Sequence, residues 1–158
     1  MPKIRPCLWF DRQAEEAVDL YLSVFDDSRV VHVERYGEAG PREEGLVMTI
    51  EFELAGQSCV ALNGGPEFHF NEAMSLYVSC ETQEEIDRYW SGLTADGGQE
   101  GPCGWLKDRF GVSWQIAPTV LDELIADPDR AKSARVTRAM LGMGKLDIAG
   151  LRAAADAA

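Results

Sequence analysis

The spacing of apolar side chains changes several times along the first half of the chain, and each change predicts a new element. Apolar residues that recur every three or four positions indicate a helix, and apolar residues that alternate with polar ones indicate a strand. The predicted elements, in chain order, are a strand at 4–10, a helix at 11–25, and strands at 28–36, 46–54 and 58–62. The clearest alternation places one set of apolar side chains on a single strand face: Leu46, Met48, Ile50, Phe52 and Leu54.

The same succession begins again after the strand-breaking residues 63–66. A strand is predicted at 73–80, and Thr82 is expected to cap a helix that ends near Leu93. A glycine-rich loop follows, and residues 105–117 then form a hairpin that turns at Phe110-Gly111.

The two halves form an internal repeat. Glu84-Glu85 lies 69 positions after Glu15-Glu16, whereas the hairpin glycine Gly111 lies 55 positions after Gly56. The second copy is therefore about 14 residues shorter between helix and hairpin, where the first copy has the glycine-rich loop 37–45.

The chain is predicted to be helical after Pro118. A short amphipathic helix comes first, and Asp127-Pro128 is expected to open a longer one. Asp147 is expected to cap a last, alanine-rich helix. Met140 and Met143 lie on one side of the longer helix, which makes a homodimer the expected assembly.

These elements predict an α+β fold with two βαβββ modules and a helical C-terminal tail. The modules are expected at about 3–64 and 72–118 within a domain over 1–118, and the tail over 119–158. With 46% hydrophobic and 27% charged residues, the 158-residue composition is that of an ordinary globular protein. Apolar runs are too short to span a bilayer, and the first residues do not resemble a secretory signal.

The charge of the chain limits the kinds of partner it can bind, and its cysteines indicate the cellular compartment. The 27 acidic and 15 basic residues give a net charge of -12, which repels nucleic acid. The four cysteines form no C-x-x-C pair, so we expect reduced, mostly buried thiols and a cytoplasmic location.

Three blocks of sequence resemble PhnB-like proteins. They are Leu8-Trp9-Phe10-Asp11 with the helix after it, Ala61-Leu62-Asn63-Gly64-Gly65-Pro66, and Cys103-Gly104-Trp105-Leu106-Lys107-Asp108 with Gly111-Val112-Ser113-Trp114-Gln115. The resemblance implies the vicinal oxygen chelate superfamily of glyoxalase I, extradiol dioxygenases and bleomycin-resistance proteins. In that superfamily paired βαβββ modules curl around a cup-shaped cavity, and members commonly dimerise. PhnB-like sequences often carry the label 3-demethylubiquinone 3-methyltransferase.

The metal ligands of that superfamily are poorly matched here. The resemblance places its last metal glutamate four residues after the hairpin glycine, where this chain has Gln115, a neutral side chain that binds metal poorly. The two histidines, His32 and His69, do not fit the ligand pattern. We therefore expect no metal and no cofactor, with His69 beside Glu67 or Glu72 as the alternative ligand set.

No catalytic residue can be assigned from motifs. The first predicted strand leads into Asp11-Arg12-Gln13, without the glycine-rich loop that most S-adenosylmethionine-dependent methyltransferases carry there. No serine lies in a G-x-S-x-G motif, and no cysteine has a histidine close to it in sequence. Whether the protein is an enzyme stays open.

The most informative functional feature is a set of aromatic, amide and hydroxyl side chains. If Gln115 faces the cavity, strand alternation places Ser113 beside it and turns Trp114 and Ile116 toward the helices. The candidate ligand pocket then comprises Trp9, Asn63, Tyr77, Trp105, Ser113 and Gln115. Such a lining suits a small organic molecule, although the aromatic side chains could also simply fill the concave sheet face.

Three functions are compatible with the sequence. The main hypothesis is a PhnB-like protein that binds a small organic ligand without metal, with its reaction unassigned. The first alternative is an enzyme: a metal-dependent lyase or dioxygenase, or a 3-demethylubiquinone methyltransferase. The second alternative is a sequestering dimer without chemistry. The sequence names no ligand and does not say whether the cavity forms within one chain or across a dimer.

Overall fold

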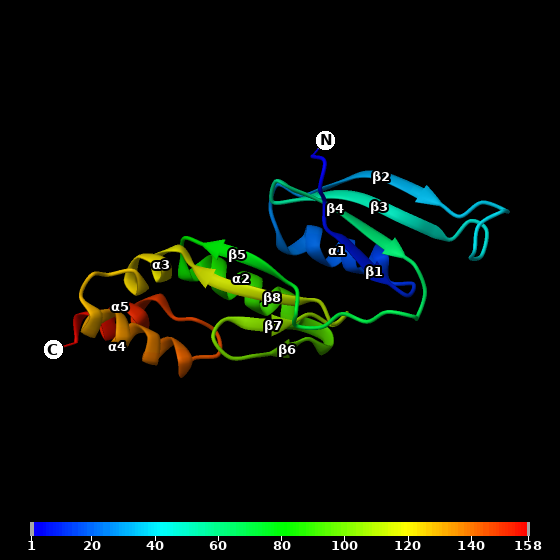
Figure 1. The fold of residues 1–158 in the computed structure, drawn as a ribbon. Helices are drawn as coiled ribbons and strands as arrows, with labels where there is room; N and C mark the ends of the chain where they lie inside the picture. Colours follow the sequence, from blue (N-terminus) through cyan, green and yellow to red (C-terminus); the bar gives the residue numbers. More distant parts are fainter. Residues whose placement is uncertain (1, 158) are drawn as a thin grey trace. The chain divides into compact units, whose positions relative to one another are not determined.

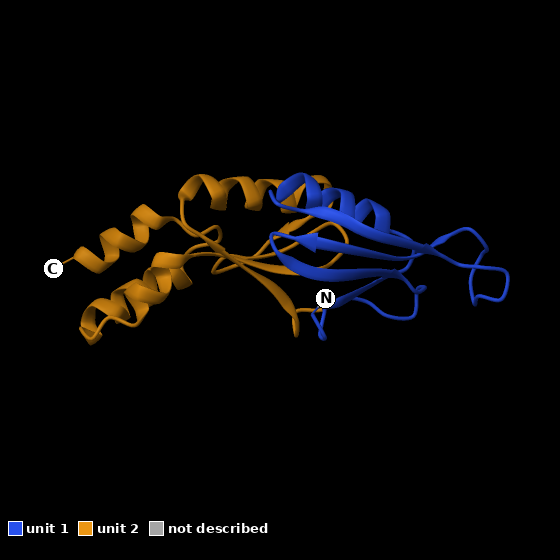
Figure 2. Cartoon of the chain, turned by 90° about the horizontal axis from the view of Figure 1, so that it is seen from above, with its two compact units in different colours: residues 1–70 blue, residues 71–158 orange. Residues whose placement is uncertain are grey.

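The computed structural model describes residues 2–157, and the chain forms two compact units, residues 1–70 and 71–158 (Figures 1 and 2). The first unit contains β1 (Cys7–Phe10), α1 (Ala14–Val24), β2 (Arg29–Arg35), β3 (Val47–Leu54) and β4 (Gln57–Asn63). The second contains β5 (Ser75–Cys80), α2 (Gln83–Thr94), the 3-10 turn η1 (Ala95–Gly97), β6 (Gln99–Glu100), β7 (Trp105–Lys107), β8 (Ser113–Pro118), α3 (Thr119–Ile125), α4 (Arg130–Leu141) and α5 (Ile148–Asp156). The predicted α+β class, βαβββ repeat and helical tail are confirmed.

The first unit is a four-stranded mixed sheet in the order β1-β4-β3-β2, with β1 parallel to β4. Helix α1 packs against one face of this sheet and buries the apolar side chains that alternate along the strands. The core consists of Leu8, Phe10, Ala17, Val18, Tyr21, Ile50, Phe52 and Ala61. The opposite face carries partly exposed and polar side chains, as the alternation predicted.

One part of the predicted alternation is wrong, at the start of β3. Val47 is buried, whereas Met48 is only partly buried. Glu34 pairs with Thr49 but Arg35 pairs with Val47, so Met48 is the extra residue of a β-bulge. The bulge reverses the order of inward and outward positions, and Val47 takes the core position that the pattern assigned to Met48.

The second unit repeats the plan in the order β5-β8-β7-β6, with β5 parallel to β8. Helix α2 packs against the face that carries Trp114 and Ile116, which are buried as predicted. The predicted cap is also confirmed: Thr82 accepts a hydrogen bond from the Glu85 amide, and the Glu85 carboxylate accepts one from the Thr82 amide.

The tail helices α3, α4 and α5 share a hydrophobic cluster with the end of β8 inside the second unit. Val136, Leu146, Leu151 and Ala155 form one buried cluster with residues of β8 and α3, and Met140 and Met143 pack partly against it. The methionine face that suggested a dimer is therefore used within its own chain. Asp147 caps α5 as predicted, through the Gly150 amide.

The start of α4 differs from the prediction. Asp129, and not Asp127, is the cap, because its carboxylate accepts hydrogen bonds from the Ala131 and Lys132 amides at 2.9 and 3.2 Å. Asp127 instead accepts a hydrogen bond from the Asp129 amide and pairs with the Lys132 ammonium. Pro128 therefore lies before the cap, outside the helix.

A buried carboxylate closes the β7–β8 turn. Asp108 is only 3% exposed. One carboxylate oxygen accepts hydrogen bonds from the Phe110 and Val112 amides at 2.9 and 3.0 Å, and the other accepts one from the Trp114 indole at 3.0 Å. These bonds determine where β8 begins and which of its side chains face α2.

We predict that Asp108→Asn destabilises the second unit. The amide keeps one acceptor oxygen for three donors, so at least one buried N–H group loses its partner, which costs about 2–3 kcal/mol of unfolding free energy. Urea unfolding followed by tryptophan fluorescence measures the loss. Asp156→Asn, at an exposed position in α5, is the control and should change stability by less than about 0.5 kcal/mol. Equal stability of the two variants would contradict the assigned role of Asp108.

Candidate functional site

The face of the second sheet that α2 leaves uncovered carries polar and aromatic side chains in two cross-strand rows. Residues that pair across neighbouring strands project to the same face. One row is Tyr77, Gln115 and Trp105, and the next is Ser75, Ser113 and Lys107. Four of the six predicted pocket residues, namely Tyr77, Trp105, Ser113 and Gln115, therefore share one sheet face.

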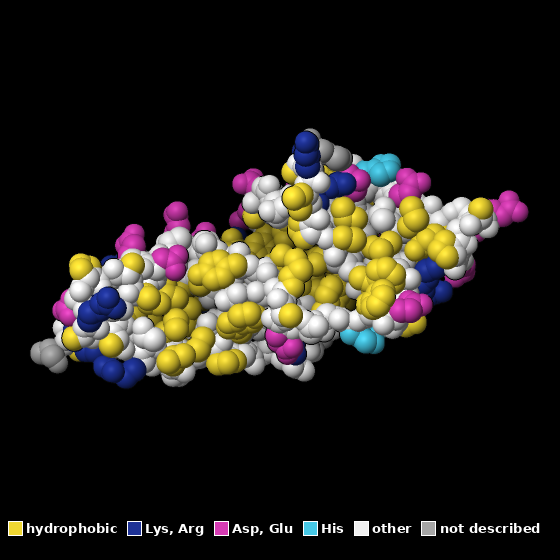
Figure 3. Space-filling model, viewed as in Figure 1, with side chains coloured by type: hydrophobic (Ala, Val, Ile, Leu, Met, Phe, Trp, Pro, Cys, Tyr) yellow, Lys and Arg dark blue, Asp and Glu magenta, His cyan; other side chains and the backbone are white. Residues whose placement is uncertain are grey.

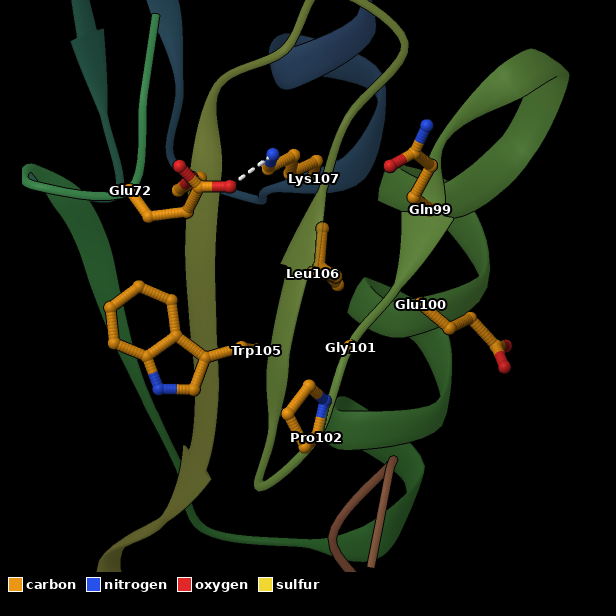
Figure 4. A pocket seen from close by; sticks show the side chains of 9 residues that line it. Glu72, Gln99, Glu100, Gly101, Pro102, Trp105, Leu106 and Lys107 are labelled. Carbon is orange, nitrogen blue, oxygen red and sulfur yellow. Dashed lines mark ion pairs between the residues drawn. The ribbon is translucent and has the colours of Figure 1, made fainter.

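A pocket of about 410 Å³ opens beside these rows (Figure 4). Its lining includes Glu72, Gln99, Pro102, Trp105, Lys107 and Ser113. The volume lies within the range of about 300–1,000 Å³ that is typical of small-molecule sites. Trp105 and Ser113 are among the lining residues, whereas Tyr77 and Gln115 lie on the same sheet face but outside the lining.

The Ser113 hydroxyl is the unusual group of this pocket. The side chain is 1% exposed, and its oxygen has no hydrogen-bond partner among the residues that the structure describes. Leaving a buried hydroxyl unpaired costs about 1–3 kcal/mol. The neighbouring Gln115 amide donates a hydrogen bond to the Ser75 hydroxyl at 2.9 Å and none to Ser113.

An ion pair lies at the same pocket. The Lys107 ammonium, on β7, contacts the carboxylate of Glu72, which lies in the segment before β5 (Figure 4). The hydrogen bond from Lys107 holds the pKa of the Glu72 carboxyl below its usual value. The Glu72 side chain is 61% exposed and that of Lys107 36%, so this pair is open to solvent and to exchange with another anion.

Asn63, a predicted pocket residue, is fully buried in the first unit. Its side-chain oxygen accepts a hydrogen bond from the Ala14 amide at the start of α1. Its nitrogen donates to the Glu15 carboxylate and to the Val47 carbonyl, at 2.9 and 3.0 Å. Asn63 therefore caps α1 from the end of β4, a role that sequence spacing did not reveal because the two sites are 49 residues apart.

Trp9, the remaining predicted residue, also lies in the first unit. Its indole donates a hydrogen bond to the Gly65 carbonyl at 2.8 Å, and its ring contacts Phe68 edge to face. A side chain at Gly64 would collide with the same ring, so a glycine is required there. The structure thus places Trp9 against the segment after β4, within the first unit.

Metal-ligating and nucleophilic side chains are scattered. Within residues 2–157, no three or more His, Cys, Asp or Glu side chains lie close enough together to hold a metal ion. His32 pairs with Glu34 at 3.1 Å on exposed β2, and His69 is exposed in the segment after β4. Burial raises the pKa of the Cys59 thiol to about 11 and that of Cys80 to about 12, so both stay protonated at neutral pH.

Comparison with known proteins gives a family and several structural relatives. Residues 2–117 match the family model described as 3-demethylubiquinone-9 3-methyltransferase. The PhnB protein from Bacillus cereus is 41% identical, and the match covers 75% of this chain and 100% of that one with a TM-score of 0.67. No curated protein matches the chain.

Two more distant structures share the fold alone. Protein PA1353 from Pseudomonas aeruginosa is 19% identical, with a TM-score of 0.61 over 75% of this chain and 98% of that one. The fosfomycin resistance protein FosX from Listeria monocytogenes is 13% identical, with a TM-score of 0.53 over 78% of this chain and 97% of that one.

We predict that Asn63→Ala destabilises the first unit. The truncation leaves the Ala14 amide and the Val47 carbonyl without their partner, which costs about 2–4 kcal/mol of unfolding free energy. Chemical unfolding followed by circular dichroism measures it. Asn71→Ala, which removes the exposed side-chain oxygen that accepts a hydrogen bond from the Ala73 amide, is the control. If both variants unfold at the wild-type denaturant concentration, Asn63 does not have the structural role assigned to it.

Proposed function

The chain belongs to the 3-demethylubiquinone-9 3-methyltransferase family, and on that basis we propose that it binds a small organic molecule in the pocket on the uncovered face of its second sheet. The resemblance to PhnB-like proteins is confirmed by the family match and by the Bacillus cereus structure. The proposal concerns binding and assigns no reaction.

One observation carries the proposal: the unpartnered hydroxyl of Ser113 at the wall of a ligand-sized pocket. Within the described residues 2–157 nothing satisfies this buried group. A ligand oxygen or nitrogen at hydrogen-bond distance would remove the desolvation cost that the unbound protein bears. A core serine without a ligand role would more commonly hydrogen-bond to backbone or to another side chain.

The apolar surroundings suit the carbon skeleton of such a ligand. Apolar side chains gather over the uncovered face of the second sheet (Figure 3). Tyr77 is 52% exposed there, and Trp105 lines the pocket two strands away, on the other side of β8. Covering this surface would yield about 25 cal/mol for each Å² removed from water. Partial burial raises the pKa of the Tyr77 phenol, which therefore stays neutral at physiological pH.

We also propose that the protein is a cytoplasmic homodimer. No helix within residues 2–157 has the length and apolar character needed to cross a membrane. We propose a cytoplasmic location because the four cysteines, all within the described residues, are free thiols. The net charge of -12 supports a partner other than nucleic acid. The proposed homodimer rests on the family resemblance, since Met140 and Met143 pack within their own chain.

A titration with 2-naphthamide, a neutral aromatic amide, tests the proposal. We expect the indole N–H resonance of Trp105 to shift in NMR spectra, while that of Trp114, which donates to the buried Asp108 carboxylate outside the pocket lining, stays in place. Trp105→Ala should weaken binding about tenfold or more, because the aromatic wall is lost. The shift of the Trp105 resonance reports where the probe binds, independently of its affinity.

Ser113→Ala separates a ligand role from a structural one. It should weaken 2-naphthamide binding about twofold to tenfold, the value of one hydrogen bond, and leave the unfolding free energy unchanged or higher. Ser79→Ala, at an exposed position of β5, is the matched control and should change neither property. Undiminished binding to Ser113→Ala, or the absence of any shift at Trp105, would refute the proposed site.

A further inference from the structure

The pocket already holds a carboxylate, that of Glu72. It contacts the ammonium of Lys107, which is paired across β7 and β8 with Ser113 and projects from the same face. Yet this carboxylate does not reach the Ser113 hydroxyl, which has no partner in the described part of the chain. A cation and an unused hydroxyl thus stand next to one another at the pocket wall, with only the cation engaged.

We propose that Lys107 and Ser113 form a subsite for the carboxylate of an aromatic acid, and that Glu72 occupies the lysine in the absence of ligand. This inference rests on the proposed function, because it assigns a chemical class to the ligand of the same pocket. Glu72 acts as an internal competitor that an incoming carboxylate displaces.

The spacing of two side chains on β7 indicates that the carboxylate ligand also carries an aromatic ring. Trp105 and Lys107 are two residues apart on one strand, so they project to the same face about 7 Å from one another. That spacing matches a molecule whose anionic group and ring system are joined directly. With its carboxylate at Lys107, the ring of such a molecule lies against the Trp105 indole.

A ligand carboxylate has two advantages over Glu72. It accepts a hydrogen bond from Ser113 in addition to that from Lys107, and it brings a ring to the exposed apolar surface around Trp105. The Glu72–Lys107 pair is open to solvent, and such pairs are held weakly. The local cation is also needed because the chain carries a net charge of -12, which disfavours anions elsewhere on its surface.

The test compares 2-naphthoate with its neutral analogue 2-naphthamide on the full chain. Removing the competitor in Glu72→Gln should tighten 2-naphthoate about twofold to fivefold, the scale of an exposed ion pair, and leave 2-naphthamide unchanged. Removing the cation in Lys107→Met should weaken 2-naphthoate about tenfold and change 2-naphthamide by less than about twofold. Dissociation constants come from calorimetry, and the Trp105 indole resonance reports the binding site.

A matched variant controls for net charge. Glu84→Gln removes one negative charge from an exposed position of α2 and should leave both affinities at the wild-type value. An equal gain for Glu84→Gln and Glu72→Gln would show a general charge effect and overturn the inference. Unchanged or weaker 2-naphthoate binding to Glu72→Gln would overturn it as well.

The failure of this inference is distinguishable from failure of the proposed function. If 2-naphthamide shifts the Trp105 resonance but Lys107→Met does not weaken 2-naphthoate, the pocket binds ligands without a carboxylate subsite. If neither molecule shifts that resonance, the proposed function and the carboxylate subsite both fall. The NMR spectra of Glu72→Gln and Lys107→Met also report whether these variants are folded.

Discussion

Strand β8 pairs with β5 on one side and β7 on the other, and its register with both decides what each face of the second unit presents. Trp114 and Ile116 lie under α2, while Ser113 and Gln115 belong to the rows on the uncovered face. A shift of one residue would exchange these two sets and place a tryptophan where the pocket is. The Asp108 carboxylate opposes such a shift, because it binds the turn amides and the Trp114 indole at once. The pocket and the hydrophobic core of this unit therefore depend on the same hydrogen bonds.

The two modules have the same order of strands and helix, but residues at corresponding positions have different roles. In the first unit the end of β4 supplies Asn63, which caps α1 from a distance. In the second unit α2 carries its own capping box, and β8 continues through Pro118 directly into α3. The uncovered face of the first sheet carries ion pairs such as Arg5–Glu51 and Arg29–Glu53. On that of the second, the Glu72–Lys107 pair lies at a pocket with an unsatisfied hydroxyl. The two modules thus have the same fold, while the uncovered faces of their sheets carry different chemical groups.

The sequence pattern was sufficient to predict the helices and strands and, for most of them, which face is buried, because the periodicity of apolar residues directly reflects burial on one side of a helix or strand. It failed at Met48, since two adjacent apolar residues hide a bulge, and at Asp129, since three acidic or turn-forming residues in a row offer several possible caps. Contacts between residues far apart in sequence could not be predicted, because a local pattern does not say which distant side chains will meet. Glu72 contacts Lys107, 35 residues later, and the Asn63 side chain binds the Ala14 amide, 49 residues earlier. Alternation along β7 could have added Lys107 to the pocket, since it shares a face with Trp105.

The central claim is that an aromatic carboxylate binds on one face of the second sheet. A crystal structure of the protein with 2-naphthoate tests it most directly. The carboxylate is expected within hydrogen-bond distance of the Lys107 ammonium and the Ser113 hydroxyl, with the ring against Trp105 and the Glu72 side chain turned away. A 2-naphthoate bound elsewhere on the protein would contradict the claim. So would a 2-naphthoate bound in this pocket while Glu72 still pairs with Lys107 and the Ser113 hydroxyl has no hydrogen-bond partner.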